Sequence, residues 1–164
     1  ITDLFTHWVD VVHMFMGQDI PTAAVASGGV YTYKDGRTAP DTINVVLEYP
    51  NDYSVTFEAT LAPGIRGEAI EFCGTKGRLY IDRRKWEYFE VGKPAPVATG
   101  KGEPPDMTGD HVLNFLECVQ SRKLPNADVL IGHRSAQASH LGNIAYLQNR
   151  KIHFDTVREE ILPL

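Results

Sequence analysis

The chain has 164 residues, of which 43% are hydrophobic and 23% are charged, and its formal net charge is −5. This composition is typical of a globular domain with a buried core, and it excludes intrinsic disorder. A nucleic-acid-binding protein would carry a basic field, so the acidic balance argues against a nucleic-acid partner. The sequence has no apolar run of the ~18 residues that a membrane-spanning helix needs, so we expect no membrane partner.

The chain opens at Ile1, without a Met and without the pattern of a signal peptide. We therefore expect residues 1–164 to be one domain of a longer parent. The cytoplasm is the default location, and export stays open because a leader would lie upstream. Cys73 and Cys118 are too far apart for a CxxC motif, and we expect both to be buried.

The predicted elements begin with a helix over 1–16 that ends at Gly17 and cannot continue through Pro21. From Thr22 to Val91 the apolar residues alternate with period 2, which predicts strands. The expected strands are Ala23–Tyr33, Thr42–Tyr49, Ser54–Leu61, Glu68–Cys73, Arg78–Asp82 and Trp86–Val91.

Short turn sequences separate these strands, so we expect antiparallel pairing. The turns are Lys34–Arg37, Pro50–Asp52 and Gly74–Gly77, and the last of these lacks the spacing of a phosphate-binding loop. The segment 92–105 is rich in Gly, Pro and Lys, and its composition predicts a mobile loop.

Two further helices follow, over Thr108–Arg122 and Val129–Asn149, with Thr108 as the expected N-cap of the first. The second has small residues every three or four positions, which predicts close packing on a neighbour. These residues are Gly132, Ala136, Ser139, Gly142 and Ala145. A short last strand is expected at Lys151–Asp155.

The order of helix, strands and then helices predicts an α+β fold, with an open, predominantly antiparallel sheet and helices packed on one face. Several strands are apolar in both phases, as in Val45, Val46 and Leu47. A sheet that is apolar on both faces must be covered, so we expect a homo-oligomer formed through the sheet face.

The first helix carries the chemically most informative residues. At ~100° per residue, Asp3, His7 and Asp10 lie within about 60° of one another, opposite an apolar arc. His13 and Met14 fall in the same polar arc. The face is either a solvated surface, an acid–base site built on His7, or a metal site. The surface reading is weakened because helix-favouring Glu, Lys, Arg and Gln are absent from it.

The rest of the sequence contains one histidine pair of less specific meaning and lacks a dinucleotide-binding motif. His133 and His140 share one face of the third helix, which fits surface histidines or a polar interface with a partner domain. The sequence has no GxGxxG motif, so the chain by itself contains no dinucleotide-binding fold.

The segment 3–10 resembles the DxxxHxxD motif of the Gfo/Idh/MocA oxidoreductases, and several later segments resemble one subgroup of that family. These segments are Pro40–Thr42, Ile70–Gly77, Asp110–Lys123 and Gly132–Ala145. The chain is thus similar to the C-terminal domain of the family over nearly all of its length.

The resemblance implies a parent in which a missing N-terminal Rossmann domain binds NAD or NADP. It implies that this chain is the substrate-binding and oligomerisation domain of an oxidoreductase that transfers hydride to or from a sugar, cyclitol or related polyol. The chain alone, which lacks the cofactor domain, is not expected to be active. The alternative is a non-catalytic dimerisation or ligand-binding module of the same fold.

Carried over by position, the resemblance implies that His7 is the general acid or base and that Asp3 binds substrate beside it. Asp10 would have a supporting role, and no cofactor-binding or metal residue is expected in the chain. Many members have Gly where this sequence has Phe5. The bulky ring is expected either to reshape the pocket or to pack in the core.

Overall fold

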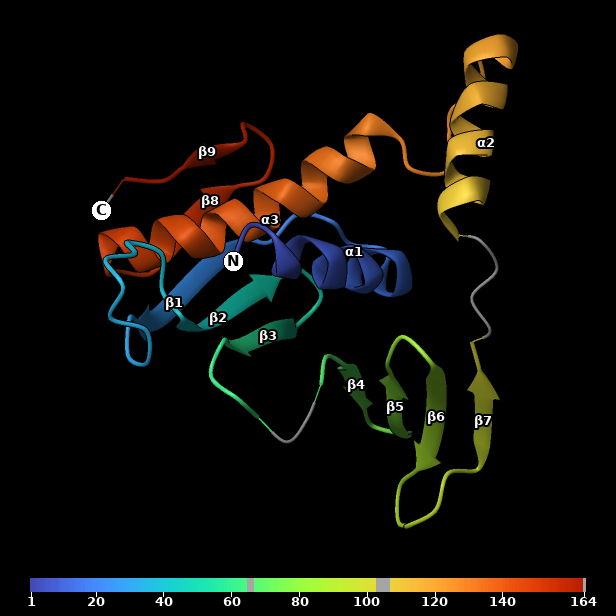
Figure 1. Cartoon of the computed structure of the whole chain (residues 1–164), viewed down its shortest axis with the longest axis horizontal. Helices are drawn as coiled ribbons and strands as arrows, with labels where there is room; N and C mark the ends of the chain where they lie inside the picture. Colours follow the sequence, from blue (N-terminus) through green and yellow to red (C-terminus); the bar gives the residue numbers. More distant parts are fainter. Residues whose placement is uncertain (65–66, 103–106, 164) are drawn as a thin grey trace. The chain divides into compact units, whose positions relative to one another are not determined.

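A computed structural model of the chain describes residues 1–64, 67–102 and 107–163 (Figure 1). The helices are α1 (Leu4–Met16), α2 (Met107–Ser121) and α3 (Val129–Gln148). The strands are β1 (Ala23–Gly29), β2 (Thr42–Tyr49), β3 (Tyr53–Thr60), β4 (Ile70–Gly74), β5 (Gly77–Ile81), β6 (Lys85–Glu90), β7 (Ala98–Lys101), β8 (Ile152–Asp155) and β9 (Glu160–Ile161). The predicted α+β class and the antiparallel pairing are confirmed.

The chain divides into two compact units, of which the first comprises residues 1–64 and 127–164 and the second residues 65–126. The expected single sheet is accordingly two sheets. The first unit has the strand order β3-β2-β1-β8-β9, and the second has the order β4-β5-β6-β7. Within the described residues, the paired strands of both sheets run antiparallel.

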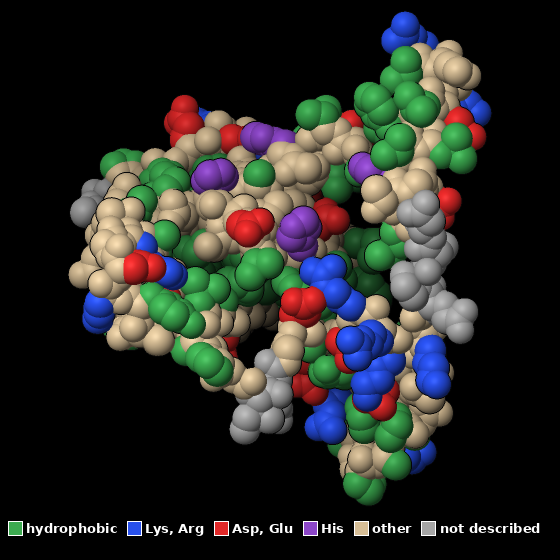
Figure 2. Space-filling view, viewed as in Figure 1, with side chains coloured by type: hydrophobic (Ala, Val, Ile, Leu, Met, Phe, Trp, Pro, Cys, Tyr) green, Lys and Arg blue, Asp and Glu red, His purple; other side chains and the backbone are tan. Residues whose placement is uncertain are grey.

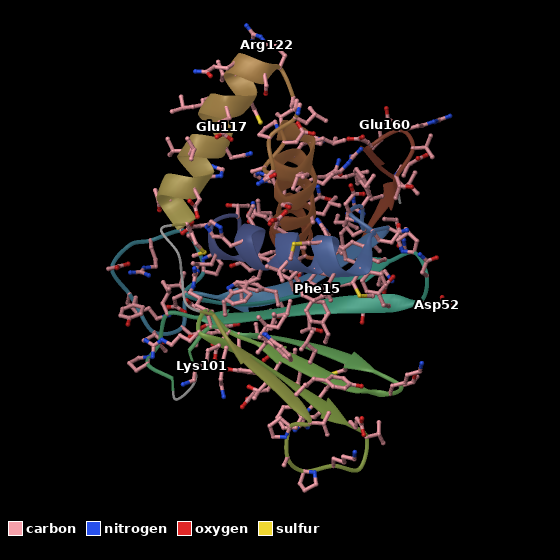
Figure 3. All side chains as sticks on the ribbon, turned by 90° about the vertical axis from the view of Figure 1, so that its right-hand side faces the viewer. Phe15, Asp52, Lys101, Glu117, Arg122 and Glu160 are labelled. Atoms are coloured by element: carbon pink, nitrogen blue, oxygen red, sulfur yellow. The ribbon has the colours of Figure 1, made fainter. Side chains whose placement is uncertain are left out.

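In the first unit, α1 and α3 lie over the same face of the sheet (Figures 1 and 3). Strand β2 alternates as its sequence predicts, with Ile43, Val45, Leu47 and Tyr49 buried under the helices. The aromatic ring of Phe5 stacks on that of Phe57 on β3, with centroids 4.4 Å apart. Phe5 is 1% exposed, so this residue packs in the core and does not line a pocket.

The small residues of α3 bring this helix close to the sheet. Ser139, Gly142 and Ala145 are buried, and a Cβ at Gly142 would lie 2.7 Å from Val45 Cγ1. The prediction of a small-residue packing surface is therefore confirmed for these three. It is wrong for Gly132, which is exposed and has open space around it.

The opposite face of the sheet is more polar than expected. Val25 pairs with Val46 across β1 and β2, and these two side chains are 40% and 36% exposed. Their outward-facing neighbours are mainly short polar residues, among them Ser27, Asn44 and Thr56. Buried apolar and exposed polar residues thus alternate more regularly than the apolar run Val45–Leu47 indicated. The pair Val25–Val46 is the exception, because both valines lie on the outer face.

Strand β1 ends four residues earlier than predicted because the chain turns around a buried carboxylate. Asp41 is 2% exposed and accepts hydrogen bonds from the backbone N–H groups of Tyr31, Thr32 and Tyr33 at 2.8–3.0 Å. The bond from Tyr33 contributes most to lowering the pKa of Asp41, which falls to about 2 although burial opposes the shift. The carboxylate thereby takes the place of a strand partner for residues 31–33.

The predicted turns and helix ends are mostly confirmed. Gly17 ends α1 in the left-handed conformation with φ of 66°, and its N–H donates to the His13 carbonyl. Three residues connect the paired residues Tyr49 and Tyr53 at the β2–β3 turn, and two of them, Asn51 and Asp52, have positive φ angles of 67° and 59°. Asn149 closes α3 in the same left-handed way.

The second unit differs from the sequence analysis in three respects. Strand β7 forms within the segment predicted as a mobile loop, because Gly100 leaves room for the indole of Trp86 on β6. Thr108 lies inside α2 and is not its N-cap. The prediction that both cysteines are buried is wrong for Cys73, which is exposed, while Cys118 is half-buried.

Candidate active site

The predicted acid–base face lies at the start of α1. Asp3 is the N-cap residue, its side chain makes no capping hydrogen bond, and it is exposed. His7 is exposed one turn later on the same helix. An exposed imidazole one turn from a carboxylate can exchange a proton with a bound hydroxyl group.

Asp10 is turned away from solvent toward α3. Its carboxylate Oδ1 accepts a hydrogen bond of 2.8 Å from the Ser135 hydroxyl, and Ser135 is 2% exposed. One turn earlier, the hydroxyl groups of Thr6 and Ser139 lie 2.9 Å apart, and Ser139 is 0% exposed. The structure therefore leaves Asp3 and His7 on the exposed side of α1 and places Asp10 at the α1–α3 contact.

The buried side of α1 also differs from the predicted arc. The buried residues are Phe5, Val9, Val12 and His13, whereas Leu4 and Phe15, two large apolar residues of the same helix, are 46% and 50% exposed. The helix is rotated so that His13 enters the core. Sequence periodicity missed this position because a histidine counts as polar in any pattern of apolar residues.

His13 forms a buried polar pair with Tyr49. Its Nε2 and the Tyr49 hydroxyl are 2.7 Å apart, while its Nδ1 is buried without a hydrogen-bond partner in the described structure. Burial lowers the pKa of His13, although the negative charges of Asp19 and Asp10 oppose the shift. A neutral, enclosed imidazole of this kind is a structural group and has no access to substrate.

His133 on α3 contacts Glu159, which precedes β9 in the C-terminal hairpin. Glu159 accepts from Arg134 at 2.8 Å, from Gln137 at 3.0 Å and is 3.2 Å from His133 Nε2. These hydrogen bonds, that from Arg134 first, lower the pKa of Glu159 to about 2. The expectation of a surface histidine is thus confirmed for His133. Figure 2 shows several histidine side chains at the surface of the face in view.

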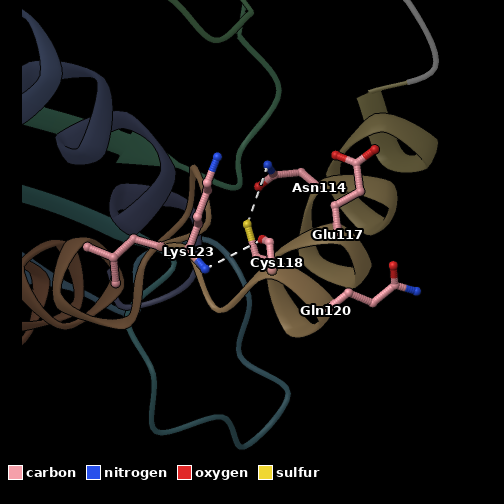
Figure 4. A pocket seen from close by; sticks show the side chains of 7 residues that line it. Asn114, Glu117, Cys118, Gln120 and Lys123 are labelled. Atoms are coloured by element: carbon pink, nitrogen blue, oxygen red, sulfur yellow. Dashed lines mark hydrogen bonds between the residues drawn. The ribbon is translucent and has the colours of Figure 1, made fainter.

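Two surface hollows are lined by residues other than His7. One of about 570 Å³ is formed by the end of α2, where Asn114 Nδ2 is 3.9 Å from the sulfur of Cys118 (Figure 4). Another of about 360 Å³ lies between α3 and the β8–β9 hairpin, beside His140 and Phe154. Neither is lined by Asp3, His7 or Asp10, so the candidate site is an open surface in this chain.

The metal interpretation of the first helix finds no geometric support. Across residues 1–64, 67–102 and 107–163, no three His, Cys, Asp or Glu side chains converge in a way that could hold a metal ion. Asp10, one of the three candidate ligands, is instead engaged by Ser135.

The arrangement also does not fit a bound dinucleotide. In the part of the chain that the structure describes, the sheets are antiparallel and no strand–helix–strand crossover of parallel strands is present. None of the helices in these segments combines the length and the apolar character needed to cross a membrane.

Comparison with known proteins finds a family match for the N-terminal part of the chain. Residues 1–80, which contain α1, strands β1 to β4 and most of β5, match the model of the GFO/IDH/MocA C-terminal domain. No curated protein matches the chain.

Solved structures share the fold at low sequence identity. They include aldose-aldose oxidoreductase from Caulobacter crescentus, with 17% identity, a TM-score of 0.74 and coverage of 92% of this chain and 46% of that chain. UDP-N-acetylglucosamine 3-dehydrogenase from Acidithiobacillus ferrooxidans has 14% identity, a TM-score of 0.69 and coverage of 87% and 45%. The WlbA dehydrogenase from Bordetella pertussis, solved with NADH and UDP-GlcNAcA, has 15% identity, a TM-score of 0.58 and coverage of 97% and 43%.

The chain spans a little under half the length of these structures. Its first 80 residues match the family model, and these structures share its fold over most of its length. The chain therefore matches the C-terminal domain of the Gfo/Idh/MocA family over residues 1–80 and shares the fold of these oxidoreductase structures over most of its remaining length.

Proposed function

We propose that this chain, as one domain over residues 1–164, is the substrate-binding and oligomerisation domain of an NAD(P)-dependent oxidoreductase that acts on a sugar, cyclitol or related polyol. The observation that carries the proposal is the first helix of a Gfo/Idh/MocA domain, on which Asp3 and His7 are exposed. The names of the sugar oxidoreductase and dehydrogenases of similar fold support the substrate class.

In this proposal His7 takes the proton of the substrate hydroxyl during oxidation and returns it during reduction. Asp3, one turn away on the exposed side of α1, accepts a hydrogen bond from a neighbouring substrate hydroxyl and orients the substrate. Asp10 has a supporting role, because its carboxylate is held by Ser135 and points away from the exposed face.

The cofactor NAD or NADP belongs to the N-terminal Rossmann domain of the proposed parent. The antiparallel sheets of this chain do not provide a dinucleotide cradle in the described residues, so no step on the cofactor is assigned to them. We expect the chain alone to be inactive.

The test is the substitution His7→Ala in the full-length protein, assayed with NAD and NADP on a panel of sugars and polyols. Loss of a general base should lower kcat at least ~10²-fold, while the melting temperature stays within a few degrees because His7 is exposed. The matched control is His111→Ala, which removes an exposed histidine of α2 and should leave kcat unchanged.

Near-normal turnover of His7→Ala would end the catalytic role of this residue. Complete absence of turnover in the unmodified full-length protein, together with stable self-association, would favour the alternative of a non-catalytic module of the same fold.

A further inference from the structure

We infer that Ser135 is a positioning residue for His7, and that it acts through Asp10. The inference rests on the proposed function, because it names the contact that sets the orientation of the helix on which the proposed acid–base residue lies. Ser135 lies 125 residues along the chain from Asp10 and outside the family-model match, so its contact with Asp10 is visible only in the folded chain.

The exposed side of α1 cannot set the orientation of His7 by itself. His7 and Asp3 both face solvent, and the direction of the imidazole therefore depends on how the helix is rotated and shifted on its support. On the apolar side, Val9 and Val12 make non-directional contacts, which tolerate small shifts. A hydrogen bond is directional and distance-limited, so a polar contact specifies the register more sharply.

Two polar contacts join α1 to α3, one helical turn apart on both helices. Asp10 Oδ1 accepts from the Ser135 hydroxyl at 2.8 Å, and the hydroxyl groups of Thr6 and Ser139 are 2.9 Å apart. Two contacts separated by four residues on each helix limit both sliding and rotation. Thr6 directly precedes His7 in the sequence, and Asp10 follows His7 by three residues.

Of the two contacts, that between Asp10 and Ser135 is the stronger, as a count of the available hydroxyl protons shows. An ionised carboxylate only accepts, so the Ser135 hydroxyl must donate, and the bond is charge-assisted. The Thr6 hydroxyl also lies 2.9 Å from the Thr2 carbonyl, and the Ser139 hydroxyl lies 3.0 Å from the Ser135 carbonyl. The two hydroxyl groups have only two protons for three contacts, namely Thr6–Thr2, Ser139–Ser135 and Thr6–Ser139. The Thr6–Ser139 hydrogen bond therefore competes with the bonds that these hydroxyl groups make to the backbone carbonyls.

Burial makes the register costly to change. Ser135 is 2% exposed, so a shift of α1 would leave its hydroxyl group without its Asp10 partner and without water. Unsatisfied buried polar groups are strongly disfavoured. The structure thus ties the position of His7 to one buried serine on α3.

The experiment compares Ser135→Ala in the full-length protein with Ser135→Ala in the His7→Ala background. Misplacement of a reacting group by about 1 Å costs up to ~10²-fold, so we expect at least about a tenfold loss of kcat in the otherwise unmodified protein. In the His7→Ala background the same change should cost less than twofold, because the group that it positions is gone. An equal loss in both backgrounds, or no loss in either, would overturn the inference.

Asp10→Ala breaks the same bond from the other side and serves if Ser135→Ala folds poorly. The double variant Asp10→Ala/Ser135→Ala should be no slower than Asp10→Ala alone, whereas additive losses would contradict a shared contact. Ser121→Ala, in the exposed last turn of α2, is the matched serine control and should keep full activity. If His7→Ala alone turns over normally, the proposed catalytic role of His7 fails. If His7→Ala is inactive and Ser135→Ala is normal, only the positioning inference fails.

Discussion

The imidazole of His13 lies in the core, where its Nε2 contacts the Tyr49 hydroxyl and its Nδ1 has no hydrogen-bond partner among the described residues. Burial disfavours the charged form, so the pKa of His13 lies below its ordinary value of 6.5 in the folded protein. In the unfolded chain the same group regains its ordinary pKa. The folded state therefore binds fewer protons than the unfolded state just below neutral pH.

This difference predicts an acid-sensitive stability. The contribution of His13 is fully present above pH 6.5 and decreases as the pH falls through 6.5 toward the lowered pKa, because the unfolded state takes up a proton first. The limiting slope for one proton is about 1.4 kcal/mol per pH unit. Urea unfolding of the chain at several pH values between 5 and 8 measures it.

His13→Gln is the informative variant, because glutamine keeps a hydrogen-bonding group near Tyr49 but does not titrate. Its free energy of unfolding should depend less on pH than that of the unmodified chain in this interval. His140→Gln removes an exposed histidine of α3 and should leave the slope unchanged. Equal slopes for the His13→Gln variant and the unmodified chain would contradict the assignment.

At the scale of the elements, α3 packs on the sheet through small residues, and its two glycines have opposite surroundings. A Cβ at Gly142 would lie 2.7 Å from Val45 Cγ1, and Val45 is itself 0% exposed and cannot move aside easily. A Cβ at Gly132 would meet no atom within 4 Å. The two positions share a helix, so intrinsic helix propensity is the same for both.

We therefore expect Gly142→Ala to destabilise the chain by about 1–3 kcal/mol through overpacking against Val45. Gly132→Ala should stabilise it by up to about 1 kcal/mol, because alanine favours the helix and nothing opposes its methyl group. Chemical denaturation of the two variants measures the difference. A stabilised Gly142→Ala variant would show that α3 does not sit this close to β2.

For the whole molecule, the outward face of the first sheet is the proposed oligomer contact. The cross-strand pair Val25–Val46 lies at its centre, flanked by short polar side chains such as Ser27 and Thr56. Flat sheets with short side chains can approach a second copy closely, and two exposed valines provide an apolar centre.

Val46→Glu places a carboxylate at this centre, so two copies would bring like charges together. We expect the variant of the full-length protein to shift toward the monomer, by at least about tenfold in the dissociation constant, in sedimentation or light scattering. Gln148→Glu adds the same charge at the exposed end of α3 and should leave the mass unchanged. An oligomer that persists in Val46→Glu would place the contact elsewhere.

The helices, most strand positions and the antiparallel pairing followed from the sequence, because periodicity, Gly17, Pro21 and the short turns act locally. The spacing of the motif on α1 likewise predicted that Asp3, His7 and Asp10 lie within about 60° of one another around the helix. These features depend on neighbours within a few residues, and such neighbours are visible in one sequence.

The tertiary structure alone decided which groups on α1 remain accessible. Ser135 turns Asp10 inward, Tyr49 takes His13 into the core, and Phe57 accommodates Phe5. Each of these partners lies more than 30 residues away, and the contacts arise only when the sheet and α3 bring the segments together. Long-range packing, which no local pattern encodes, therefore decided that Asp3 and His7 stay exposed while Asp10 turns toward α3.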